Sequence, residues 1–142
     1  MKFKFSLEPV LKVRQHQEKI QKQKLAEEIS NKNKITLLRN EAQKKLENYL
    51  DNKKNQTAAN IHLIKRHNAH IVEVNEHINK LGDKEKEANG KVKNERGKLA
   101  EAFKKLSILE KVKETEQGLY VKAEASVDLK FMDEISTQSF NR

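Results

Sequence analysis

The sequence has no cysteine, one proline and four glycines among its 142 residues. Without cysteine, the chain has no disulfide, no thiolate zinc site and no cysteine nucleophile. Aromatic residues make up 5% of the chain and charged residues 36%, which excludes a thick globular core. No apolar run approaches the roughly 18 residues that a membrane-spanning helix needs. What remains is a highly charged chain with very few residues that interrupt a helix.

The residues that are present favour long helices. Lys, Glu, Leu and Ala dominate, a composition typical of coiled coils. Ser6 is expected to cap the first helix, and Pro9 falls in the first turn, where its missing N–H costs little. Up to about residue 50, one side of this helix is apolar and carries Val10, Val13, Ile20, Ile35, Leu38, Ala42, Leu46 and Tyr49. A helix this long and this polar has to lie along another helix.

The second half of the chain repeats the pattern. A heptad seam is expected at Ile61, Ile64, Asn68, Ile71, Asn75 and Ile78. Gly82–Asp83 and Asn89–Gly90 are helix stop signals, and another apolar stripe follows them. We therefore predict an all-α fold, a long antiparallel two-helix coiled coil or helical hairpin. Its arms would be about 6–81 and about 91–138, with the turn within 82–90, in one elongated domain over 1–142.

No pattern in the sequence indicates catalysis. The chain has no glycine-rich phosphate loop and no nucleophile elbow, and a two-helix rod has no concave pocket for paired carboxylates. Four of the five histidines fall close together, at His62, His67, His70 and His77. Their spacing suits a metal, but no acidic residue or cysteine completes a compact ligand set. We expect no enzyme activity, no metal, no cofactor and no small-molecule substrate, and we place the histidines on the solvated side of the seam.

The net charge of +9 leaves other functions open. A basic coiled coil can bind nucleic acid or an anionic surface, and a broad apolar stripe can serve a homo-oligomeric scaffold. Basic residues alternate with Glu and Asp along most of the chain, however, as on the solvated faces of a coiled coil. Nucleic acid is therefore the less favoured partner, and we expect a cytoplasmic setting.

Both ends of the chain resemble one family. "FSLEPVLKVRQHQE", residues 5–18, and "LKFMDEISTQSFNR", residues 129–142, are similar to the two ends of the flagellar export protein FliJ family. The residues that carry the resemblance are Phe5, Leu7, Val10, Leu11, Arg14 and Glu18 at the start, and Met132, Asp133, Glu134, Phe140 and Arg142 at the end.

The resemblance implies a non-enzymatic component of the flagellar type III export apparatus. It implies a cytoplasmic protein, peripheral to the inner membrane at the flagellar base, whose coiled coil is similar to the central stalk of rotary ATPases. Members of the family sit in the ring of the hexameric export ATPase and promote its assembly and activity. They also contact the cytoplasmic domain of the export gate FlhA and handle export chaperones.

Two partner surfaces are expected on this basis. Phe3, Phe5, Leu7 and Phe140 have no assigned partner in the seam, which motivates a surface for the ATPase ring. We assign to that surface Phe5, Leu7, Val10, Leu11, Arg14, Phe140 and Arg142. A second surface, for the export gate, is expected on the side of the rod at Leu38, Leu46, Tyr49, Ile71 and Ile78. Plain coiled-coil packing is the alternative role for these five residues.

Overall fold

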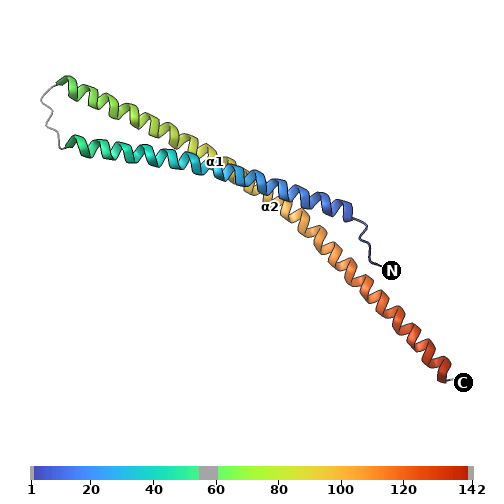
Figure 1. The fold of residues 1–142 in the computed structure, drawn as a ribbon. Helices are drawn as coiled ribbons and strands as arrows, with labels where there is room; N and C mark the ends of the chain where they lie inside the picture. Colours follow the sequence, from blue (N-terminus) through green and yellow to red (C-terminus); the bar gives the residue numbers. More distant parts are fainter. Residues whose placement is uncertain (1, 55–60, 141–142) are drawn as a thin grey trace. The chain divides into compact units, whose positions relative to one another are not determined.

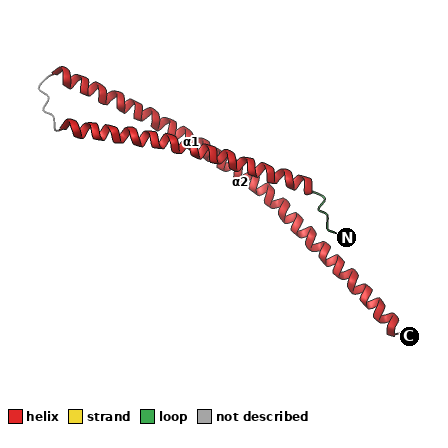
Figure 2. Cartoon of the chain, viewed as in Figure 1, coloured by secondary structure: helices red, strands yellow, loops and turns green. Residues whose placement is uncertain are grey.

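Two long helices make up the structure. This computed structural model describes residues 2–54 and 61–140, in which helix α1 spans Glu8–Lys54 and helix α2 spans Ile61–Phe140 (Figure 1). Helix is the only regular secondary structure in these two described ranges (Figure 2). The two helices pack against each other as a helical hairpin, so the predicted all-α fold is confirmed.

The predicted position of the turn is wrong. Residues 82–90 lie inside α2, and the helices are separated by residues 55–60, which lie outside the described residues. Gly82 and Gly90 have no positive φ, so neither adopts the left-handed conformation of a helix stop. Each glycine costs about 1 kcal/mol relative to Ala in a helix interior. Burial of Leu81, Ala88 and Val92 around them offsets this cost and keeps the helix continuous.

The chain divides into two compact units. Unit 1 comprises Met1–Ile20 and Ala100–Arg142, and unit 2 comprises Gln21–Leu99. Within unit 1, Glu8 of α1 pairs with Lys113 of α2. Within unit 2, Gln21 donates a hydrogen bond to Glu95, and the Tyr49 hydroxyl contacts the ring nitrogen of His67. The order of these contacts in unit 2 shows that its two helical segments run antiparallel. The single domain expected over residues 1–142 stays a prediction.

A regular heptad seam joins α1 to α2 in each unit. The shielded side chains recur at alternating steps of three and four residues, the spacing of a coiled coil. In unit 2 the seam positions are Gln21, Leu25, Glu28, Lys32, Ile35, Arg39, Ala42, Leu46 and Tyr49 on α1, and His67, Ile71, Val74, Ile78, Leu81, Glu85, Ala88, Val92, Glu95 and Leu99 on α2. Ile29, Thr36 and Leu50 are half-buried beside the α1 positions. In unit 1 the α2 members are Ala102, Leu106, Leu109, Lys113, Glu116 and Tyr120.

Part of the predicted seam is therefore displaced. Ile71 and Ile78 lie in the observed seam, but Asn68 and Asn75 are exposed. Ile61 and Ile64 are also exposed, as are Val10, Val13 and Ile20 on α1. The apolar residues alone indicated other positions, because charged and amide side chains such as Gln21, Arg39 and Glu95 occupy places in the observed seam.

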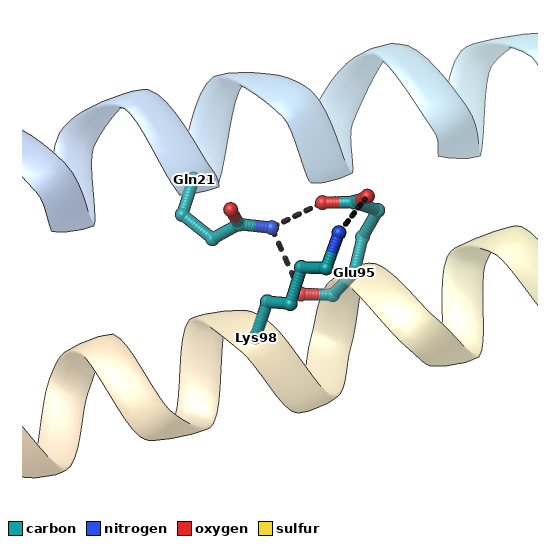
Figure 3. Close-up of polar contacts among 3 residues, drawn as sticks. All are labelled: Gln21, Glu95 and Lys98. Atoms are coloured by element: carbon teal, nitrogen blue, oxygen red, sulfur yellow. Dashed lines mark hydrogen bonds and ion pairs between the residues drawn. The ribbon is translucent and has the colours of Figure 1, made fainter.

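Polar residues of the seam pair across it. The side-chain amide of Gln21 donates to the carboxylate of Glu95 and to its backbone carbonyl, the latter at 3.2 Å (Figure 3). Lys98 Nζ lies 3.5 Å from the same carboxylate. Further along unit 2, Arg39 Nη1 lies 2.8 Å from Glu85 Oε2. Gln21, Arg39, Glu85 and Glu95 therefore each have a partner on the opposite helix, which limits the penalty for shielding them from water.

The best-buried cluster lies in unit 1. Phe5, Leu11 and Leu106 form it, and Phe3 and Leu109 pack against it. The Phe3 ring lies 5.5 Å from the ring of Tyr120. A turn at residues 5–8 leads into α1, in which the amide of Leu11 donates to the carbonyl of Leu7 at 2.9 Å. Helix α1 begins at Glu8, so Leu7 rather than the predicted Ser6 takes the capping position.

Candidate binding surfaces

A groove of about 470 Å³ opens between the two helices of unit 2. Helix α1 supplies Leu38, Ala42, Leu46 and Tyr49, which lie on one face because they are spaced by three or four residues. Helix α2 supplies His70, Val74, His77 and Leu81, at steps of four, three and four residues. Glu41 and Lys45 complete the lining. The groove thus has an apolar floor and a rim of histidine and charged side chains.

Tyr49 is the aromatic centre of this region. Its hydroxyl lies 2.8 Å from Nδ1 of His67, and the two rings are 5.0 Å apart. The His70 ring meets Tyr49 edge-on at 4.8 Å. On α1, Lys53 Nζ lies 5.7 Å from the centre of the Tyr49 ring, within the range of a cation–π contact. These contacts fix the tyrosine ring where it lines the groove.

His62, His70 and His77 are exposed beside the seam, as expected for its solvated side, whereas His67 lies in the seam itself. His67 is half-buried and bonded to Tyr49, while His70 and His77 line the groove. Over residues 2–54 and 61–140, no group of three or more His, Cys, Asp or Glu residues is placed to hold a metal ion. Imidazoles beside an apolar floor can instead offer hydrogen bonds to the edge of a docked peptide.

The structure brings together three of the five residues expected to contact the gate. Leu38, Leu46 and Tyr49 line the groove. Ile71 and Ile78 are half-buried in the seam, and Ile78 lines a separate hollow with Arg39. The groove residues that the sequence did not single out for this surface are Glu41, Ala42, Lys45, His70, Val74, His77 and Leu81. The α2 side of the groove does have a signal in the sequence, because His70, Val74, His77 and Leu81 recur at helical spacing. A search that allowed histidine among the apolar residues would have found it.

The residues expected to contact the ring lie in unit 1 and are not all available. Phe5 and Leu11 are core residues, 7% and 3% exposed, and Phe3 packs against them, so the premise that Phe3 and Phe5 lack partners is wrong. Leu7 and Val10 are each 40% exposed.

The remaining residues expected to contact the ring are Arg14, Phe140 and Arg142. Arg14 is half-buried and donates to Gln17 Oε1 at 3.1 Å. Phe140 ends α2, and nothing is described of its side chain. Arg142 lies outside the described residues. Among the described ring-surface residues, the accessible apolar groups are therefore Leu7 and Val10.

Neither helix, over its described residues, holds a stretch long and apolar enough to cross a membrane. Neither a curated protein nor a solved structure matches the chain. A family model described as "Flagellar FliJ protein" matches residues 3–142, which is nearly the whole chain. Members of this family are non-catalytic coiled-coil components of the flagellar export apparatus. The extent of the match and the observed hairpin agree, and the chain therefore belongs to the flagellar FliJ protein family.

Proposed function

We propose that this chain couples the export ATPase to the export gate without catalysing a reaction itself. It enters the ring of the hexameric ATPase, promotes the assembly and activity of the ring, and contacts the cytoplasmic domain of FlhA and the export chaperones. Its place is in the cytoplasm, at the inner membrane face of the flagellar base. Family membership supports the setting in the export apparatus. The observation that carries the coupling role is the open apolar groove of unit 2.

The groove is the proposed gate surface. Leu38 is 53% exposed, so a partner that covers it removes apolar surface from water. Tyr49 is held by His67 and His70 and presents a rigid aromatic wall. An apolar side chain on a helix or loop of the gate fits between these groups, in the manner of a helix in a groove. Ile71 and Ile78 belong to the seam, so their substitution is expected to weaken the hairpin as well as gate binding.

The proposed ring surface lies in unit 1, around the first turn of α1. Leu7 and Val10 offer their exposed apolar surface to the ring. Phe5 and Leu11 hold this turn in place from the core, and Arg14 adds a positive charge one turn further along. Phe140 and Arg142 complete the proposed set. The ring and gate surfaces therefore fall in different units of the chain.

Gate binding is tested by isothermal titration with the isolated cytoplasmic domain of FlhA. Leu38→Glu places a charge in the groove and is expected to weaken binding by about tenfold or more, as at an interface hot spot. Leu37→Glu is the matched control, because Leu37 is 59% exposed and does not line the groove. Equal affinities for the two variants would remove the groove from the proposal.

Ring binding is tested by ATP turnover of the hexameric ATPase with and without the chain. The double variant L7E/V10E is expected to lose stimulation, whereas L37E keeps it. Substitution is preferable to deletion of residues 1–11, since deletion would also remove Phe5 and Leu11 from the core. Full stimulation by L7E/V10E would count against the ring surface.

A further inference from the structure

The last part of α2 carries a third apolar surface, separate from the proposed gate and ring surfaces. Every side chain from residue 121 to residue 139 is exposed. Leu119, Ala123, Val127, Phe131 and Ile135 follow one another at intervals of four residues and lie in one row, which we call the C-terminal stripe. Leu119, Val127 and Phe131 are 61–64% exposed and Ile135 is 47% exposed. A contiguous apolar row of this kind marks an interaction site.

Opposite charges border the C-terminal stripe on its two sides. Glu124 and Asp128 each follow a stripe residue directly and form an acidic flank. Lys122 and Lys130 each precede a stripe residue directly and form a basic flank, although Glu134, directly before Ile135, lies on the same side. On a helix, these two sets of positions lie on opposite sides of the row between them. Glu124 and Lys130 are equidistant from Val127, three residues before it and three after it.

We infer that the C-terminal stripe binds the same stripe of a second copy of this chain. A row at intervals of four residues is the ridge that packs helices at a crossing angle of about 50°. A two-fold axis along the stripe brings each stripe residue to its own counterpart, as in an isologous interface. It also places the acidic flank of one copy against the basic flank of the other. Glu124 of each copy then lies beside Lys130 of the other copy, which gives two symmetric ion pairs.

This charge pattern favours a second copy of the chain as the binding partner and favours one orientation of that copy. In the reversed orientation, Glu124 and Asp128 of the two copies would face each other, which is unfavourable. In the chosen orientation Glu134 approaches Asp128 of the second copy, which weakens the pairing. An anionic membrane surface fits less well, because residues 121–139 carry two lysines against four acidic residues. Amphipathic helices that lie on membranes carry Lys and Arg on their polar face instead.

The contact is short, so the dimer is expected to be weak and dependent on concentration. Interfaces that bury less than about 1,200 Å² belong to transient encounters. Ala123, the smallest member of the row, lets the two backbones approach each other closely on one side of the crossing point at Val127.

Sedimentation velocity of the full chain over a concentration series tests this inference. The wild type is expected to shift from monomer towards dimer, and Phe131→Glu is expected to raise the dissociation constant about tenfold or more. Leu129→Glu is the matched control, because Leu129 is 65% exposed and lies on the opposite side of the helix. A wild type that stays monomeric, or equal loss in both variants, would overturn the inference.

Two further variants test the orientation. Lys130→Glu and Glu124→Lys are each expected to weaken the dimer, whereas the double variant E124K/K130E regains it. Since the chain has no cysteine, Val127→Cys is also a clean cross-linking probe. Mild oxidation should link two copies through residue 127, and Leu129→Cys should link them much less. Failure of the double variant to recover, or equal cross-linking at both positions, would overturn the two-fold arrangement.

Discussion

Tyr49 on α1 and His67 on α2 are joined by a 2.8 Å contact between the phenol oxygen and Nδ1. Among the seam positions, Tyr49 is the nearest to residues 55–60 on α1 and His67 is the nearest on α2. Their contact therefore holds α1 to α2 at the end of unit 2 where the groove lies. A change here is expected to act on the stability of the unit and on the wall of the groove together.

Tyr49→Phe is expected to lower the free energy of unfolding by about 1 kcal/mol, since it removes one hydrogen bond and keeps the ring. Tyr49→Ala should cost more, because the ring contacts to His67, His70 and Lys53 are lost as well. Urea unfolding followed by circular dichroism measures both values. If Tyr49→Phe matches the wild type within error, the hydroxyl contact contributes nothing to stability.

Leu106→Ala is expected to destabilise the chain by about 2–3 kcal/mol, the lower part of the range for buried leucines, because the surrounding core is thin. Leu106 is 5% exposed and packs with Phe5 and Leu11. Ile108→Ala is the control on the same helix, since Ile108 is 61% exposed and its truncation should change stability by less than about 0.5 kcal/mol. Similar losses for the two variants in urea unfolding would contradict the assignment of the core.

Gly90→Ala is expected to raise the free energy of unfolding by about 0.5–1 kcal/mol, because Gly90 lies in a helix interior. A Cβ at this position meets no atom within 4 Å, so the gain is not offset by a clash. Lys91→Ala at the exposed neighbouring position controls for general effects on the helix. A turn at residues 82–90 would give the opposite result, since alanine is strained in the left-handed conformation of a glycine stop.

Acid should weaken unit 2 through Glu95. The hydrogen bond from Gln21 is the main cause that lowers the pKa of this carboxyl, and the positive charges of Lys98 and Lys24 lower the pKa further, while desolvation opposes them. The folded pKa lies below the unfolded value, so the unfolded chain binds the proton first as the pH falls. The stabilisation is therefore present at neutral pH and is lost as the pH falls through the lowered pKa of Glu95.

Glu95→Gln removes this titration and should reduce the fall in Tm between neutral pH and about pH 3. Glu101→Gln makes the same change at an exposed position of α2 and serves as the control. Thermal unfolding followed by circular dichroism at several pH values measures the difference. An unchanged acid-induced fall in Tm for Glu95→Gln would mean that the Gln21–Glu95 bond does not contribute to it.

The helical fold was predictable because scarce glycine and proline, together with heptad spacing, leave few other structures for the chain. The exact seam was harder to predict. Gln21, Arg39, Glu85 and Glu95 occupy seam positions, and each is stabilised by a partner on the opposite helix. Such pairs cannot be identified until the register of the two helices is known. A search for apolar residues alone therefore favoured exposed positions such as Val13 and Ile64.

The turn was misplaced for a related reason. Glycine is tolerated in a helix when its neighbours are well packed, and packing is not visible in a single sequence. The groove was found in part, because Leu38, Leu46 and Tyr49 share one face of α1 in the sequence itself. Its α2 side includes His70 and His77, whose place in the lining becomes apparent only when the two helices are paired.

The chain has no tryptophan and two tyrosines, and the structure places Tyr49 in unit 2 and Tyr120 in unit 1. Each unit therefore carries its own intrinsic fluorophore. In a chain with phenylalanine at one of these two positions, emission comes from the other unit alone. Partner docking and local melting can thus be followed optically in either half of the hairpin, without attaching a dye.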